Sequence, residues 1–138
     1  MIKAELDRQL MISVDNTVGS LAEVTSVVSA SSINEIAICA YSVGNKVAIM
    51  FVTEDNNAAK KLLEEQGFIV QEEEVVLITI DNKPGALQRI TDKIADAGVD
   101  LRLIYGSVAP GQNLARIVVI AENNLDIVMI VKTELERS

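Results

Sequence analysis

The sequence predicts an α+β protein built from two tandem copies of a βαββαβ unit, each with an antiparallel sheet and both helices on one face. Three observations predict this class. The chain repeats itself at a constant offset, each copy alternates short β-branched runs with helical spacing, and the 138 residues are 49% hydrophobic but only 3% aromatic. A unit of about 65 residues buries too little surface to be very stable alone. We therefore expect the two copies to pack on each other or on a second chain.

The internal repeat aligns Leu10–Tyr41 with Val76–Ser107 at a constant offset of 66. Seven positions are identical, namely Ile12/Ile78, Asp15/Asp81, Asn16/Asn82, Gly19/Gly85, Leu21/Leu87, Thr25/Thr91 and Ile38/Ile104. Four of the seven fall between Asp15 and Leu21. Chance similarity between two apolar segments would not gather at polar and glycine positions, so the two halves are expected to share one fold.

Each copy begins with a strand, a turn and a helix. The β-branched runs Leu10–Val14 and Val75–Ile80 have strand composition, and an Asp-Asn-x-x-Gly turn follows each of them. Apolar residues then recur at steps of three and four, which places them on one face of a helix. These residues are Leu21, Val24 and Val28 in the first copy and Leu87, Ile90, Ile94 and Ala97 in the second. Gly98 is suited to end the second of these helices.

A strand hairpin and a further helix are expected next in each copy. The hairpins are residues 35–42 with 46–53 and 101–107 with 114–121, joined by the turn segments Val43–Asn45 and Ala109–Asn113. In the first copy, Asp55 is the expected N-cap of a helix from about Asn56 to Gln66, and Phe68–Glu72 is expected as a fourth strand. In the second copy, Leu125–Leu135 is rich in Ile and Val, which weakens its helix tendency. Its place in the repeat nevertheless favours a helix over a strand.

This order of elements is the split-βαβ, or ferredoxin-like, pattern, whose crossovers are right-handed. The acidic run Glu72–Glu74 is expected to be a solvated junction, which divides the chain into a first domain at residues 1–72 and a second at 73–138. The second domain is expected to lack its last strand. Ile2, Ala4 and Leu6 alternate with polar residues and form a candidate strand to cover the open edge. A frayed terminal segment is the other interpretation.

Charge and cysteine content exclude several classes of function. The formal net charge of −8 argues against nucleic acids and anionic membrane surfaces, both of which require basic patches. The single cysteine, Cys39, cannot form an internal disulfide. No stretch approaches the ~18 apolar residues of a membrane span, and the charged N-terminal segment lacks the apolar run of a signal peptide. A cytoplasmic location is therefore expected.

The two strand–helix loops resemble those of the ACT domain family. Asp81–Leu87, followed by a helix and then Ala97–Leu101, is similar to the ACT domain. Asp15–Leu21 with Ile33-Asn34 is a looser version, in which Val18 replaces the proline. The resemblance covers nearly the whole chain and extends to the layout of stand-alone tandem ACT-domain proteins. It implies a regulatory module that senses an amino acid at the seam of paired units, between the first strand–helix loop of one unit and the start of the second strand of its neighbour.

Carried over position by position, the resemblance implies a set of ligand-binding residues. The set comprises Asp15, Asn16, Gly19, Ser20 and Asn34 from the first copy, and Asp81, Asn82, Pro84, Gly85, Ala86, Leu87 and Asp100 from the second. The chemistry of the loops agrees, because a helix N-terminus presents unpaired N–H groups and partial positive charge that favour a carboxylate. Asp-Asn-x-x-Gly is also ordinary turn and N-cap chemistry. For Asp100, a solvated carboxylate at the start of a strand is the other interpretation.

These features favour a non-catalytic sensor or regulatory protein that binds an amino acid or a similar carboxylate metabolite. The sequence has no histidine and shows no nucleophile–base pair, cofactor loop or metal-ligand spacing, so no enzyme activity, cofactor or metal is expected. The alternative is a ligand-free interaction module that regulates a partner enzyme through the edge left by the missing strand. A homodimer is expected in either case, since small units with long apolar strands tend to pair symmetrically.

Overall fold

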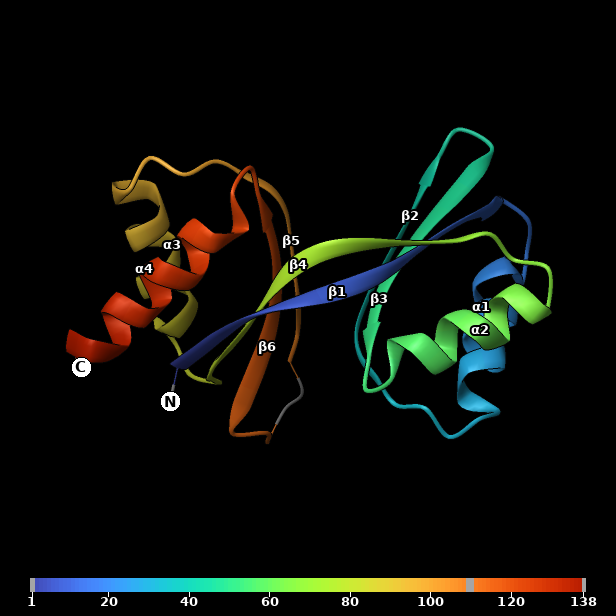
Figure 1. The fold of residues 1–138 in the computed structure, drawn as a ribbon, viewed down its shortest axis with the longest axis horizontal. Coiled ribbons are helices and arrows are strands. Elements are labelled where there is room, and N and C mark those ends of the chain that lie inside the picture. Colours follow the sequence, from blue (N-terminus) through green and yellow to red (C-terminus); the bar gives the residue numbers. More distant parts are fainter. Residues whose placement is uncertain (1, 109–110, 138) are drawn as a thin grey trace. The chain divides into compact units, whose positions relative to one another are not determined.

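A computed structural model describes residues 2–108 and 111–137. These residues form two compact units (Figure 1). One unit is Arg8–Glu73, and the other consists of the described residues within Met1–Asp7 and Glu74–Ser138. The hairpin tip expected at Ala109 and Pro110 lies outside the described residues. The division into domains after residue 72 stays a prediction, and the compact units differ from it in where residues 2–7 belong.

Each half of the described chain has the expected order of strands and helices. The elements are β1 (Ile2–Asp15), α1 (Ser20–Ser29), β2 (Glu35–Val43), β3 (Lys46–Thr53), α2 (Asn56–Glu65), β4 (Val70–Asp81), α3 (Ala86–Asp96), β5 (Leu101–Ser107), β6 (Leu114–Ala121) and α4 (Asn124–Arg137). The helix favoured for residues 125–135 is present within α4. The tandem ferredoxin-like fold is therefore confirmed.

In the unit Arg8–Glu73, the strands lie in the order β2-β3-β1-β4. β3 pairs antiparallel with β1 and β2, and the register places Phe51 of β3 opposite Leu10 and Ile38. Helices α1 and α2 lie together on one face of this sheet (Figure 1). Val24 and Val28 of α1 are fully buried, as their spacing of four predicts. The core between helices and sheet consists of Leu10, Ile12, Val24, Val28, Ile49, Phe51, Ala59, Leu63 and Val70.

The second unit repeats this arrangement with the order β5-β6-β4-β1. β6 pairs antiparallel with both β4 and β5, and Val119 lies opposite Val76 and Ile104. Helices α3 and α4 form the helical layer (Figure 1), and Ile90 and Ile94 of α3 are buried against the sheet. The core consists of Val76, Ile78, Ile80, Ile90, Ile94, Ala115, Ile117, Val119, Ala121, Ile127 and Val131.

The N-terminal segment takes the place of the missing fourth strand of the second unit. Residues 2–7 belong to β1, β1 is the neighbour of β4, and these residues fall in the same compact unit as residues 74–81. Ile2 and Ala4 pack against the apolar core of this unit. Leu6, expected on the same face, is 47% exposed. The interpretation as a covering strand is therefore confirmed for Ile2 and Ala4, and the frayed segment is excluded.

The acidic run Glu72–Glu74 is not fully solvated, which corrects part of the sequence interpretation, although the boundary between the two compact units does fall within it, between Glu73 and Glu74. It lies inside the continuous strand β4, and Glu72 and Glu73 are half-buried. The adjacent strand supplies the polar partners that make this possible. Arg8 Nε donates to Glu72 Oε2 at 2.8 Å, and Gln9 Nε2 donates to Glu73 Oε1 at 3.1 Å. Composition alone suggested that these carboxylates lie in solvent, whereas the adjacent strand gives Glu72 and Glu73 a donor each. The exposed Glu74 accepts from Asn124 Nδ2 of α4 at 3.2 Å.

The role of residues 2–7 can be tested by placing charges on the buried side of the strand. We expect the double substitution of Ile2 and Ala4 by Asp to lower the free energy of unfolding by about 2–4 kcal/mol, because it buries unpaired carboxylates. Urea unfolding followed by circular dichroism measures the change. Lys3→Asp combined with Glu5→Asp, on the exposed side of the strand, is the matched control and should have little effect. Equal losses in both variants would contradict the assignment.

Candidate functional site

The first strand–helix loop is held by a glycine N-cap and a set of short hydrogen bonds. Gly19 precedes α1 with a φ of 89° and caps the helix without a side-chain hydrogen bond. This left-handed conformation is costly for a residue with a Cβ. The carbonyl of Asp15 accepts from the Thr17 N–H at 2.9 Å and from the Ser20 hydroxyl at 2.8 Å. The loop is therefore closed on itself, while no side chain caps the first N–H groups of α1.

The second strand–helix loop has the same backbone geometry. Gly85 precedes α3 with a φ of 87° and again provides no side-chain cap. The Lys83 N–H donates to the carbonyl of Asp81 at 3.0 Å, as the equivalent groups do in the first loop. The N–H groups of Asn82 and Asn16 each donate to the carbonyl of an asparagine at the start of the adjacent hairpin strand, at 2.9 and 2.8 Å. In both copies of the repeat, the helix after the loop therefore begins without a side chain that caps its N–H groups.

A hollow of about 380 Å³ lies beside the first loop, and the positively charged side chain of Lys46 is among its lining residues. It is lined by Ser13, Val14, Asp15, Thr17, Ser20, Glu23, Lys46, Gly67, Phe68 and Ile69. Lys46 lies opposite Asp15 in the strand register, and its Nζ is 2.6 Å from Asp15 Oδ1. This hydrogen bond and the charge of Lys46 hold the pKa of the Asp15 carboxyl below its ordinary value. An ammonium and a helix N-terminus, which both attract a carboxylate, thus lie at the same end of the unit.

The surroundings of the second loop are different. The position equivalent to Lys46 is Leu114, which lies opposite Asp81 in the strand register and carries no charge. The Asn82 amide Nδ2 donates to the carbonyl of Gln112 at 3.0 Å. Lys83 supplies a cation from within the loop, with its Nζ 4.0 Å from Asp81 Oδ2. Pro84 fixes the backbone at the turn. The second loop therefore combines a stiffer turn with a looser ion pair than the first loop has.

Exposed apolar side chains border each loop. Leu21 and Leu87, in the first turns of α1 and α3, are each 41% exposed, although their spacing predicted a core-facing position. Val18, which stands where the second loop has Pro84, is fully exposed. Ala86, at the first position of α3, has no hydroxyl where the first loop has Ser20. The loops therefore present apolar surface beside the polar helix N-terminus.

Asn34 and Asp100 do not lie at the same end of their units as the loops. Asp15 is opposite the first residue of β3, whereas Glu35, directly after Asn34, is opposite the last. Seven residues of strand span about 23 Å. In the other unit, Asp81 and Leu101 lie opposite the two ends of β6 in the same way. The structure thus brings together the predicted loop residues within each unit, and it does not bring the strand-start residues to them.

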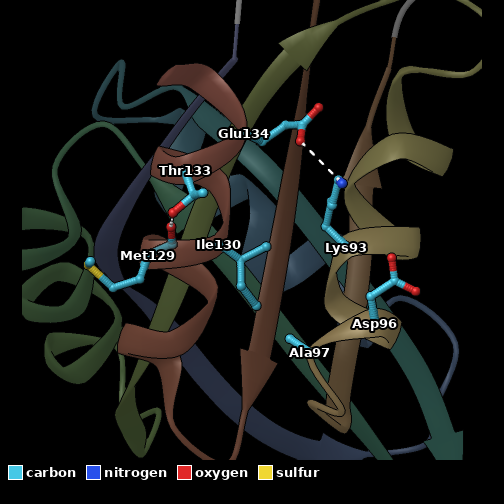
Figure 2. Close-up of a pocket in the computed structure, with 7 residues that line it drawn as sticks. All are labelled: Lys93, Asp96, Ala97, Met129, Ile130, Thr133 and Glu134. Carbon is cyan, nitrogen blue, oxygen red and sulfur yellow. Dashed lines mark hydrogen bonds and ion pairs between the residues drawn. The ribbon is translucent and has the colours of Figure 1, made fainter. Parts of the chain in front are cut away.

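A second hollow lies between α3 and α4, away from the predicted residues (Figure 2). Its volume is about 430 Å³, and its lining is Lys93, Asp96, Ala97, Met129, Ile130, Thr133 and Glu134. Glu134 is only 7% exposed. Its carboxylate accepts from Arg89 Nη2 at 2.6 Å and lies 3.9 Å from Lys93 Nζ. The two cations of α3 neutralise this buried charge, so the cluster ties the two helices together.

Neither a metal centre nor a membrane span is found in the described part of the chain. Among residues 2–108 and 111–137, no group of three or more His, Cys, Asp or Glu side chains is arranged to hold a metal ion. None of the described helices combines the length and the apolar character needed to cross a membrane.

Comparison with known proteins agrees with this geometry. The sequence matches the ACT domain pair family over residues 5–135. Protein BT0572 from Bacteroides thetaiotaomicron is 28% identical, with a TM-score of 0.84 over 95% of this chain and 90% of that chain. The regulatory subunit of aspartate kinase from Thermus thermophilus, in its ligand-free form, is 16% identical, with a TM-score of 0.68 over 96% of this chain and 95% of that chain. The corresponding subunit from Thermus flavus is 15% identical, with a TM-score of 0.58 over 96% and 95%. A search of curated proteins returned no match.

The fold and its paired loops define a tandem of ferredoxin-like regulatory modules. The chain belongs to the ACT domain pair family. Domains of this family are regulatory and non-catalytic, and they commonly bind amino acids.

The glycine N-caps can be tested by adding a single methyl group. No atom lies within 4 Å of a Cβ built on Gly19 or Gly85, so substitution by Ala adds backbone strain without a clash. We expect each Ala variant to lower the free energy of unfolding by about 1–2 kcal/mol. Asn tolerates the left-handed region better than Ala, so the Asn variants should lose less. Chemical denaturation measures the difference, and Ala variants as stable as the wild type would contradict the assigned conformation.

The link between Lys46 and Asp15 can be tested through the pKa of the carboxyl. We expect Lys46→Met to raise the pKa of Asp15 toward its ordinary value of 3.8, and Lys46→Arg to keep it low. Because the folded pKa lies below the unfolded one, the pair stabilises the fold above the unfolded pKa. This contribution is lost as the pH falls through the folded pKa, and salt weakens it because both groups are exposed. NMR titration of the carboxyl carbon measures the shift. An unchanged Asp15 pKa in Lys46→Met would contradict the pairing.

Proposed function

We propose that this protein is a regulatory sensor that binds a small carboxylate metabolite, with an amino acid as the best fit, at its two strand–helix loops. The observation that carries the proposal is the conserved loop geometry. Both loops place a left-handed glycine directly before a helix that no side chain caps. The N–H groups of such a helix start, together with its partial positive charge, match a carboxylate.

The proposed binding residues fall into two groups with different tasks. Backbone N–H groups in the first turns of α1 and α3 hold the ligand carboxylate, beyond those of Ser20 and Ala86, which donate to the carbonyls of Thr17 and Lys83. The adjoining loop residues shape the rim. The loop group is Asp15, Asn16, Gly19 and Ser20 in the first loop and Asp81, Asn82, Pro84, Gly85, Ala86 and Leu87 in the second. Asn34 and Asp100 are proposed to meet the remaining polar groups of a ligand held by a neighbouring ACT unit, since each lies at the far end of its own unit from the loop.

The two loops are proposed to differ in affinity. The first loop has Lys46 within its hollow, and a ligand carboxylate there competes with Asp15 for that ammonium. The second loop has Pro84, which lowers the ordering cost of binding. Each loop has one lysine nearby, but only the second has the stiff turn that reduces the entropy lost on binding, so the two sites are expected to differ in affinity.

The output of the sensor is proposed to pass through another protein chain, because ACT domains act as regulatory modules. Strand β2 is at the edge of its sheet and exposes apolar side chains, with Ile38 39%, Tyr41 51% and Val43 60% exposed. An edge of this kind is suited to pair with a second copy in a homodimer or with a regulated enzyme. If no metabolite binds, this surface favours the second candidate function, an assembly module that acts through protein contacts alone.

A thermal-shift panel of the common amino acids and related 2-oxo acids tests the proposal. A ligand present at 100 times its dissociation constant should stabilise the folded protein by about 2.7 kcal/mol. Asn16→Ala, which removes an exposed loop amide without touching the glycine, should weaken the response of the first site.

Asn57→Ala is the matched control, since Asn57 is exposed on α2 outside the loops. It should respond to the ligand as the wild type does. A flat panel at millimolar concentration would contradict the sensor and leave the assembly module. A response that is the same in Asn16→Ala and in the wild type would place binding outside the first loop.

A further inference from the structure

A third hollow, which shares no residue with the one beside the first loop, lies where β2 begins in the unit Arg8–Glu73. Its volume is about 520 Å³. One wall comes from α1 and the other from the chain that leads into β2. The lining residues are Thr25, Ser26, Ser29, Ile33, Asn34 and Glu35. Four of the six are neutral polar residues, one is apolar and one is acidic, so the hollow contains no cation of its own.

One carboxylate oxygen of Glu35 has no hydrogen-bond partner among the described residues. Among side-chain nitrogen and oxygen atoms of described residues that are not exposed, only Glu35 Oε1 is buried without a hydrogen-bond partner. Burial also raises the pKa of the Glu35 carboxyl above its ordinary value. An unsatisfied buried acceptor costs about 1–3 kcal/mol, and more when it is charged. The chain thus retains a group that destabilises its own fold.

The internal repeat shows that the fold does not require an acid at this position. The equivalent of Glu35 in the second copy is Leu101, which packs against the apolar core of its unit. Both residues begin an edge strand, and the strand register is irregular directly after each of them. A leucine therefore fits the same local backbone. Glu35 disfavours folding at a position where the second copy has a leucine. A residue that costs stability in this way is typical of a functional site.

The other polar groups of the hollow are oriented as acceptors. The hydroxyls of Thr25, Ser26 and Ser29 donate their protons to backbone carbonyls of α1, at 3.2, 2.9 and 3.2 Å. Their oxygen lone pairs remain available to a donor. The Asn34 amide donates at 3.5 Å toward the exposed carboxylate of Glu54, which adds a second negative charge near the rim. A donor-rich cation with a short aliphatic stem, able to contact Ile33, fits this combination.

We propose that this hollow binds an organic ammonium group, with Glu35 as its counter-ion. The proposal deepens the proposed function, because Asn34 belongs to both sites and a zwitterionic amino acid needs a partner for its ammonium as well as for its carboxylate. One part of the proposal rests on the proposed function, namely that the same ligand places its carboxylate at a strand–helix loop of a neighbouring unit. The capture of an ammonium by Glu35 can be measured separately.

NMR titration of the full-length protein with ethylammonium chloride tests the proposal. We expect saturable shifts of the backbone amides of Ser26, Ser29 and Asn34, and none with potassium chloride at the same ionic strength. Glu35→Gln should weaken the binding of ethylammonium at least about tenfold, because it removes a charged acceptor. Glu35→Leu, which copies the second unit, should abolish it. Both variants should melt above the wild type in the absence of ligand, so loss of folding does not obscure the result.

Glu65→Gln is the control, because it removes the same charge from an exposed position on α2. It should bind ethylammonium as the wild type does. Three outcomes would each overturn the proposal: no saturable shift, an equal affinity in Glu35→Gln, or an equal response to potassium.

A parallel titration with sodium acetate separates this proposal from the proposed function. Acetate shifts at residues 16–21 or 82–87 without an ethylammonium response would contradict the ammonium site at Glu35. They would still support carboxylate binding at the loops. An ethylammonium response that depends on Glu35, without any acetate response at the loops, would support the Glu35 site and remove the support for carboxylate capture.

Discussion

The strand pairing between β1 and β4 is the constraint on which both units depend. A βαββαβ unit needs a fourth strand to complete its sheet, and here each long strand serves two units. The unit Arg8–Glu73 contains residues 8–15 of β1 and residues 70–73 of β4. The other unit contains residues 2–7 of β1 and residues 74–81 of β4. The unit Arg8–Glu73 is therefore one continuous stretch of sequence, whereas the other unit combines residues 2–7 with residues that follow Glu73. Because units of this size are marginally stable alone, the shared strands make the folding of each half depend on the same two segments.

Most of the fold could be predicted because the elements expected in one copy of the repeat can be compared with those of the other copy. Asp15, Gly19 and Leu21 recur at a fixed offset, and one copy therefore resolves ambiguities in the other, as it did for the helix α4. At the same offset, residues 2–7 align with residues 68–73, and both segments contribute to the fourth strand of a unit. The misses concern the surroundings of single side chains, such as the exposed Leu6. The acidic run at 72–74 was interpreted from composition, which does not reveal that Arg8 and Gln9 supply donors from the adjacent strand.

In the candidate site, too, features with a local cause in the sequence were predictable, and features that depend on distant strands were not. The loop residues were predictable because a glycine before a helix has a local conformational cause, which the sequence records directly. Lys46 was missed because its contact with Asp15 depends on strand register, although the short hairpin between β2 and β3 offers a signal that could have found it. Glu35 was missed because an acid at the start of a strand is expected to be solvated. Only the structure shows that one of its oxygens is shielded from water and lacks a donor.

Anion recognition by a chain with a net charge of −8 is physically consistent. Net charge governs long-range attraction, whereas a helix N-terminus supplies partial positive charge from the backbone at short range. The loops therefore need no excess of basic residues, and one lysine lies beside the aspartate of each loop. The same acidic background suits a cationic group at Glu35, so one molecule with both charges meets complementary surroundings at each end of a unit.

The sharing of β1 also sets an order of events during synthesis. Residues 8–73 form a unit that is complete once Glu73 has left the ribosome, whereas residues 2–7 belong with strands that follow much later. At about 5–20 residues per second, the 48 residues from Glu74 to Ala121, which contain β5 and β6 and the rest of β4, take roughly 2–10 seconds to be added. During this interval the first part of β1 is an extension of an already folded sheet with no partner strand beyond it. Residues 2–7 therefore offer a pairing edge to residues 74–81 when the second unit is synthesised.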